Sequence, residues 1–169
     1  MDDIALLRRA VDDASRLFDG VREDQLDLPT PCPDFTVRQL IAHVAEGMEM
    51  FAAASDGSAP AADPEWKSAG DHVVAAFERP GALEGNIELP YGAFPAIVGL
   101  QQALGETAIH ATDVARATGQ SLGDDDVYES VFRVVTPDWR VESVLGPEVP
   151  CPDGASLLDR VQAFAGRAI

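Results

Sequence analysis

The chain has little positive charge and no long hydrophobic run. Only 12 lysine and arginine side chains stand against 29 aspartate and glutamate side chains, a formal net charge of −17 at pH 7. So acidic a surface repels nucleic-acid phosphates and anionic lipid head groups. No apolar segment approaches the roughly 20 residues that a membrane-spanning helix needs. Nucleic acid and membrane partners are therefore not expected. Because the N-terminal segment also lacks the basic start of a signal peptide, we expect a cytoplasmic protein.

Cysteine is equally scarce, since the chain has only Cys32 and Cys151, each within a Pro-Cys-Pro-Asp tetrapeptide. Two cysteines so far apart make no disulfide framework, so reduced thiols are expected. One of them could serve as a redox switch or an additional metal ligand. The alternative, a buried or incidental cysteine, is favoured by the pattern.

The length and hydrophobic content suit one compact unit. The chain has 169 residues, of which 46% are hydrophobic. This is enough to bury one substantial core, and no change of composition marks a domain boundary. We therefore predict a single domain over residues 1–169.

Apolar side chains recur every three or four residues in several segments, which is the pattern of amphipathic helices. A helix that starts at Thr36 has the spacing of a capping box between Thr36 and Gln39. A proline-rich loop is expected over 28–34, and a short strand or an extended loop over 86–92. The other expected helices cover residues 2–19, 66–77, 95–118, 125–135 and 156–165. The sequence thus predicts an all-α fold, a four-helix bundle with a short irregular C-terminal extension.

The longest expected helix carries Glu106 and His110, four residues apart and therefore on one helix face. His43, in the helix that follows the proline-rich loop, is the third candidate ligand. Two histidines and one carboxylate form a ligand set for a catalytic divalent metal that keeps a position open for water or substrate. Gly99 and Ala103 share the face of Glu106, and their small size predicts open space beside the site.

Other interpretations of these residues remain. A glutamate and a histidine four residues apart are often only a solvated pair on a helix. His72 competes as a ligand, but its acidic and exposed neighbours favour a surface histidine. Asp113 lies three residues beyond His110 and either orients that ligand, handles protons or forms a surface ion pair with Arg116.

Five segments together resemble a known family, the actinobacterial maleylpyruvate isomerase-like proteins of the DinB superfamily. These segments are 30–44 (TPCPDFTVRQLIAHV), 80–83 (PGAL), 88–92 (ELPYG), 110–120 (HATDVARATGQ) and 160–167 (RVQAFAGR). The similarity extends over nearly the whole chain. It implies a DinB-like four-helix bundle that holds a divalent metal, most often zinc or nickel.

By position, the resemblance makes His43, Glu106 and His110 the metal ligands. It also implies a low-molecular-weight thiol such as mycothiol as a second cofactor. We therefore expect a metal-dependent enzyme of thiol transfer or thiol-assisted isomerisation that acts on a small electrophilic substrate, with Asp113 as a catalytic, proton-handling residue. The partners would be the substrate and the thiol, with a homodimer possible.

Two further hypotheses stay open at this point. The protein could be a non-catalytic helical bundle that binds a metal or a small ligand. It could also be a purely structural interaction module, which would require an inward-facing Glu106 to be neutral or paired with an arginine.

Overall fold

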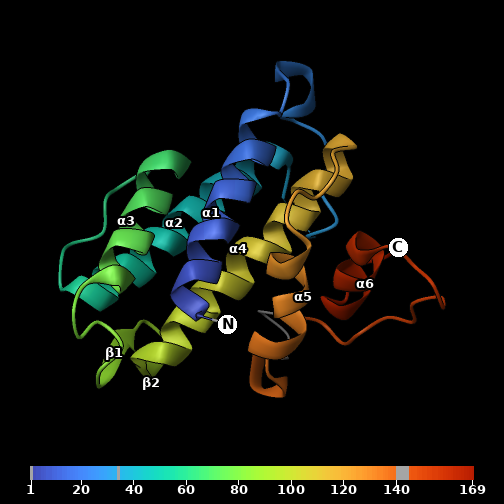
Figure 1. The fold of residues 1–169 in the computed structure, drawn as a ribbon. Helices are drawn as coiled ribbons and strands as arrows, with labels where there is room; N and C mark the ends of the chain where they lie inside the picture. The colour runs from blue at the N-terminus through green and yellow to red at the C-terminus, as the bar shows by residue number, and fades with distance from the viewer. Residues whose placement is uncertain (1, 34, 140–144) are drawn as a thin grey trace.

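The computed structural model describes residues 2–33, 35–139 and 145–169, and these residues form six α-helices and one β-hairpin (Figure 1). The all-α prediction is confirmed, with the hairpin as a small addition. The helices are α1 (Asp3–Asp19), α2 (Val37–Asp56), α3 (Trp66–Glu78), α4 (Ala96–Thr118), α5 (Asp125–Val134) and α6 (Leu157–Phe164). Short 3-10 turns cover Glu23–Gln25 and Pro137–Trp139. Among the described residues, no helix is both long and apolar enough to cross a membrane.

The start of α2 is set by local hydrogen bonds, as its sequence predicts. The Thr36 hydroxyl accepts from the backbone N–H of Gln39, and the Gln39 side chain accepts from the backbone N–H of Thr36 at 3.0 Å. These bonds satisfy two donors that the first helical turn would leave free. Gly57 follows the last helical residue and ends the helix. Its φ of 77° lies in the left-handed region, which glycine adopts readily because it has no side chain.

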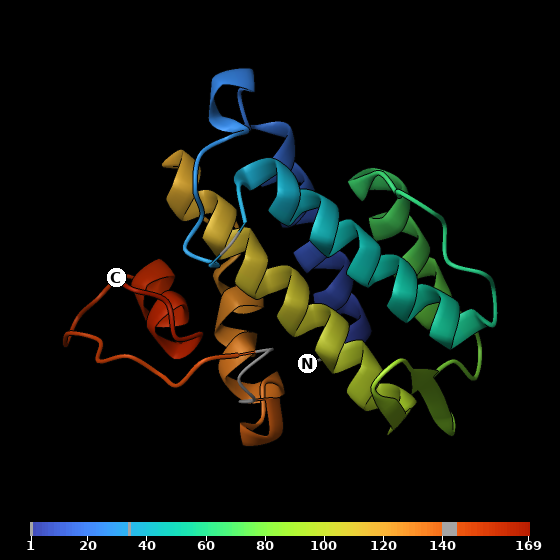
Figure 2. The ribbon, with the colours of Figure 1, turned by 180° about the vertical axis from the view of Figure 1, so that it is seen from behind.

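Helices α1 to α4 pack together as the expected bundle, and α4 runs through its centre (Figure 1). Fifteen residues of α4 are buried, because α1, α2, α5 and α6 all contact this helix. Helix α2 lies directly beside α4, as Figure 2 shows, and the Thr107 hydroxyl donates to the sulfur of Met48 across that contact at 3.2 Å. The α2–α4 contact is the one that brings the candidate ligands together.

The segment before α4 forms an antiparallel hairpin of β1 (Asn86–Leu89) and β2 (Gly92–Pro95), which settles the choice between strand and loop. The hairpin also corrects one expectation about α4. A side chain at Gly99 would overlap the side chain of Ile87 from β1, so the space above this glycine is filled by protein. Ala103 is likewise fully buried. These small residues permit close packing and do not open a cleft.

The C-terminal part contains α5 and α6 where helices were predicted, and residues 145–156, before α6, form no helix or strand, as an irregular extension would. Helix α5 is attached to α1 through the Tyr128 hydroxyl, which donates to the Asp13 carboxylate at 2.6 Å. Helix α6 packs on α5 and α4. The chain after α4 therefore covers one side of the central helix, close to the candidate site.

Candidate metal centre

The three predicted ligand side chains meet between α2 and α4. The Nε2 atoms of His43 and His110 each lie 3.2 Å from Oε1 of Glu106. One ligand atom from each residue lies within 4.8 Å of the other two. The helical turn accounts for the closeness of Glu106 and His110, whereas the packing of α2 on α4 brings His43 to them.

The exposure of the three side chains increases from His110 through Glu106 to His43. The His110 side chain is 8% exposed, that of Glu106 is 27% exposed and that of His43 is 41% exposed. The ring of Phe35 lies beside the ring of His43, with centroids 5.0 Å apart. The centre is thus closed on the His110 side and accessible beside His43, which leaves a direction for a further ligand to approach.

His110 is oriented by a hydrogen bond on its far side. Its Nδ1 lies 3.0 Å from Oδ2 of Asp113, a carboxylate that is fully buried. Because the carboxylate accepts the proton of Nδ1, Nε2 is the nitrogen left to face the centre. Asp113 therefore has the place predicted for a residue that orients a ligand.

Asp113 is held by two side chains from the C-terminal part. The amide of Gln162 donates to Oδ1 at 2.9 Å, and the guanidinium of Arg167 donates to Oδ1 at 3.2 Å and to Oδ2 at 3.3 Å. The alternative of a surface ion pair between Asp113 and Arg116 is wrong, because Arg116 pairs with Asp159 and Asp113 points inward. A fully buried carboxylate needs such partners to stay ionised.

Sequence reasoning missed Gln162 and Arg167 as parts of this site. Both lie in a segment whose similarity to the family was noticed, yet their distance from Asp113 along the chain hides the contact. The sequence offered no local signal for these contacts, because the burial of Asp113, which calls for a cationic partner, is itself decided by tertiary packing.

The electrostatics of the centre favour a bound cation. Burial raises the pKa of Glu106, but the positive charge of His110 and hydrogen bonds from both histidines lower it further, to well below its ordinary range. Burial lowers the pKa of His110, but the charge of Glu106 and the hydrogen bonds to Asp113 and Glu106 together raise it to about 10. The carboxylate is therefore ionised, and His110 holds a proton that a metal ion would displace.

The donor set fits a divalent transition metal. Two imidazole nitrogens and one carboxylate oxygen suit zinc and nickel, and three protein ligands leave coordination positions free. In the part of the chain that the structure describes, Glu106 is paired with His43 and His110 and with no arginine. The arrangement that the purely structural hypothesis required is therefore not found.

Cys32 lies closer to the centre than its sequence context suggested. Its sulfur forms a second group with His110 and Asp113, in which the three possible ligand atoms are within 4.8 Å of one another. Burial raises the pKa of the half-buried Cys32 thiol. Cys151 is exposed and belongs to neither group. Cys32 therefore borders the closed side of the site as a neutral thiol.

His72 takes no part in the centre, and its side chain is 29% exposed, so it lies at the surface as the sequence favoured, but there it is paired with two carboxylates. Its Nδ1 lies 3.1 Å from both carboxylate oxygens of Glu49, and its Nε2 lies 3.1 Å from Oδ2 of Asp56. Glu49 is buried and also accepts from the backbone N–H of Ala61 at 3.2 Å. This Glu49–His72–Asp56 cluster ties α3 and the 57–65 connection to α2.

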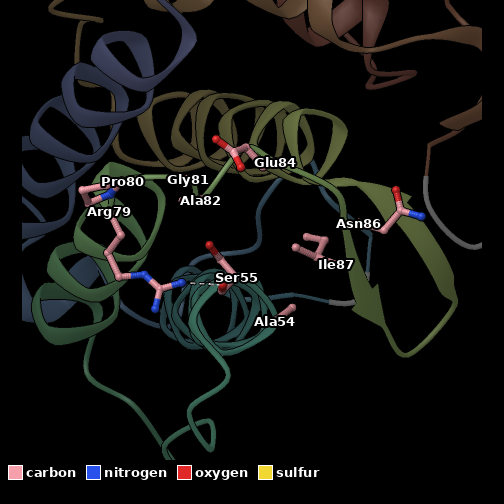
Figure 3. A pocket seen from close by; sticks show the side chains of 9 residues that line it. All are labelled: Ala54, Ser55, Arg79, Pro80, Gly81, Ala82, Glu84, Asn86 and Ile87. Carbon is pink, nitrogen blue, oxygen red and sulfur yellow. Dashed lines mark hydrogen bonds between the residues drawn. The ribbon is translucent and has the colours of Figure 1, made fainter.

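A cavity of about 440 Å³ lies elsewhere, where α2 and α3 end (Figure 3). Its lining includes Ser55 from α2, Glu84 and Ile87. Arg79 also lines it and donates to the backbone carbonyl of Ser55 at 2.7 Å. None of the predicted ligands borders this cavity. The candidate metal centre lies outside this cavity, between α2 and α4.

Comparisons with known proteins agree with the fold and with the resemblance noted in the sequence. Residues 7–86 match the family described as "Mycothiol maleylpyruvate isomerase N-terminal domain". Two uncharacterised proteins from strains of Mycobacterium tuberculosis are 34% identical to this chain, over the whole of this chain and the whole of each relative.

Two solved structures share the fold. A crystal structure of the mycothiol-dependent maleylpyruvate isomerase superposes with a TM-score of 0.63 at 19% identity, and one of its point mutants with a TM-score of 0.65 at 18% identity. Each match covers 98% of this chain and 88% of the other chain. At this level of identity, the superposition establishes the bundle architecture only.

Proposed function

Because the chain belongs to the maleylpyruvate isomerase-like family, we propose that it is a metal-dependent enzyme that uses a low-molecular-weight thiol to transfer or isomerise a small electrophilic substrate. The observation that carries this proposal is the convergence of His43, Glu106 and His110 at a centre with one accessible side. A structural metal site would have four protein ligands and no open position. Here the three-residue set leaves room for an external thiol.

His43, Glu106 and His110 would hold zinc or nickel. Bound there, the cation supplies positive charge that lowers the pKa of a coordinated thiol or water and so provides a nucleophile at neutral pH. The carboxylate of Glu106 offsets part of this charge. It also lies between the two histidines, so it fixes the spacing of both ring nitrogens.

The remaining residues hold this geometry. Asp113 accepts the Nδ1 proton of His110 and so keeps the opposite nitrogen free for the metal. Gln162 and Arg167 fix the direction of the Asp113 carboxylate. Asp113 is buried behind His110, so the role we propose for it is to position this ligand and to keep its Nδ1 proton in place during the reaction.

The choice of mycothiol as the thiol rests on the relatives. The crystallised isomerase that shares this fold is named as mycothiol-dependent. The ring of Phe35 beside His43 gives the accessible side one apolar wall. Such a wall shields a reacting thiolate from water on that side.

Three measurements on untagged protein test the proposal. Metal content by mass spectrometry should approach one zinc or nickel per chain. In the cobalt-loaded protein, mycothiol should produce the intense near-ultraviolet absorption of a thiolate-to-cobalt bond. The loaded protein should then consume mycothiol together with an electrophile faster than the mixture without protein.

The alternative is a non-catalytic bundle that binds a metal or a small ligand. Stoichiometric metal without a thiolate band and without turnover would support it and remove the enzymatic proposal. Protein that takes up neither zinc nor nickel when they are supplied would remove the metal centre itself.

A further inference from the structure

One helical glycine at the metal centre is not required by the packing of the protein. Four glycines lie inside the described helices, where glycine destabilises a helix relative to alanine because it loses more conformational freedom on folding. At three of them, a Cβ would come closer than 3.0 Å to a side chain of another element: Gly70 against Val11, Gly99 against Ile87 and Gly105 against Trp139. These three glycines permit close packing. The fourth is Gly47 of α2.

Gly47 has no such neighbour among the described residues. Apart from the backbone of α2 and the two chain neighbours, a Cβ there would meet a single atom within 4 Å, Cγ of Glu106 at 4.0 Å. This is an ordinary van der Waals distance, so α2 and α4 could approach as closely with alanine at this position. The backbone of Gly47 is helical and has no positive φ. The protein itself would therefore accept alanine here, and alanine would favour the helix.

Position 47 adjoins the proposed ligands. Gly47 follows His43 by four residues, so the two share one face of α2. The atom that Gly47 faces belongs to Glu106, whose Oε1 lies 3.2 Å from the Nε2 atoms of His43 and His110. Gly47, His43 and Glu106 are all half-buried, whereas His110 is buried. The space over Gly47 therefore borders the accessible side of the centre.

The helix directions show where this space leads. Helices α2 and α4 run antiparallel past the centre, since the ring of His43 lies 5.4 Å from that of His110 and Gly47 lies against Glu106, one turn further along α2. A ligand of the metal that extends over Gly47 therefore leaves the centre on the side away from His110.

We propose that Gly47 is a specificity-determining residue, which leaves the surface of α2 bare so that the body of the metal-bound thiol lies over it. This inference rests on the proposed function and states where the part of the thiol beyond its sulfur is held. A ligand in van der Waals contact with a helix backbone leaves no room for a side chain at that point. The glycine thus serves the bound state, because the protein's own packing does not need it.

The test compares two thiols of different size on cobalt-loaded protein, where the thiolate-to-cobalt absorption reports binding. Mycothiol has a large body beyond its sulfur, whereas 2-mercaptoethanol has only a short alcohol. Gly47→Leu should raise the dissociation constant of mycothiol roughly 10-fold or more and that of 2-mercaptoethanol by less than about twofold, because overpacking affects only the ligand that fills the space. Gly47→Ala, the smaller change, should act in the same direction. Ala75→Leu, the matched control at an exposed position of α3, should equal the wild type with both thiols.

The outcomes separate this inference from the proposed function. If Gly47→Leu and Gly47→Ala leave the affinity for mycothiol unchanged, or weaken both thiols equally, the inference is overturned while the absorption band of the wild type keeps the proposed function in place. If the wild type shows no band with either thiol, the proposed function is removed and the inference with it.

A stability measurement tests the premise without a thiol. In zinc-loaded protein, Gly47→Ala should raise the equilibrium constant for folding roughly two- to fivefold, because alanine favours the helix and a Cβ fits at this position. Gly70→Ala is the control that should lower the constant, since Val11 lies in the way of a Cβ there. Urea unfolding measures both. A constant that is unchanged or lowered in Gly47→Ala would show that the protein's own packing needs this glycine, which would overturn the inference.

Discussion

Two histidines of this chain each lie between two carboxylates, and the two clusters differ in what surrounds them. His110 lies between Glu106 and Asp113, and His72 lies between Glu49 and Asp56. All four carboxylate contacts are 3.0 to 3.2 Å long. Both histidines also have a raised pKa. By local geometry alone, the two clusters are nearly the same.

The two clusters differ in whether a third possible metal ligand reaches the histidine. At His110, the Nε2 atom and the Glu106 carboxylate are joined by His43 from another helix, which completes a ligand set. At His72, each ring nitrogen is taken by a carboxylate of α2, and no such set of three converges among the described residues. His72 thus connects α3 to α2, whereas His110, whose two carboxylates lie on its own helix, belongs to a candidate metal centre because His43 of α2 reaches the same point.

The largest expected effect separates the two histidines directly. His110→Ala and His43→Ala each remove a proposed ligand, so zinc affinity should fall by more than the roughly 10–100-fold that loss of a supporting residue costs. His72→Ala should leave zinc affinity within about threefold, because its cluster does not contribute to the centre. Competition with a chromogenic chelator measures all three constants. Similar zinc affinity in His110→Ala and His72→Ala would remove the assignment of the centre.

The second prediction concerns the carboxylate behind each histidine. Asp113→Asn should weaken zinc binding by roughly 10–100-fold, because an amide accepts the Nδ1 proton of His110 less strongly and leaves Arg167 without its counter-charge. Asp56→Asn, the matched change beside His72, should leave the affinity unchanged. The same chelator competition applies, with circular dichroism to verify the fold. Unchanged affinity in Asp113→Asn would show that the buried contact does not support the ligand.

The smallest effect is on stability as a function of pH. Burial lowers the pKa of His72, but hydrogen bonds to Asp56 and Glu49 raise it by more, to above its ordinary value of 6.5. Its stabilising contribution is therefore complete below pH 6.5 and is lost as the pH rises through the raised pKa. For a partly exposed group, the contribution should not exceed about 1 kcal/mol.

Urea unfolding of zinc-loaded protein at pH 6 and pH 9 checks this prediction, because a metal-bound His110 does not titrate in that range. His72→Gln should reduce the free energy of unfolding at pH 6 more than at pH 9. An equal reduction at both pH values would show that the charge on His72 does not contribute to stability.

Much of the fold could be predicted because its signals are local. The capping box at Thr36 and the proline-rich loop before it mark the start of α2 through neighbouring residues. The observed ends of α1, α3, α4, α5 and α6 differ from the predicted ones by about one residue. Local signals failed where packing between distant segments decides. Gly99 was expected to open a cleft, but the side chain of Ile87 fills the space beside it. The contacts of His72 with Glu49 and Asp56 were not foreseen either.

The sequence by itself determined the helices and the shared face of Glu106 and His110, because the 3.6-residue turn of a helix places residues four apart side by side. The tertiary structure decided which histidine meets that pair. It also decided that Asp113 is buried, and that Arg167 returns from the C-terminal part to hold it. These contacts join residues up to 63 positions apart, so they depend on how α2 and α6 pack on α4 rather than on any local pattern.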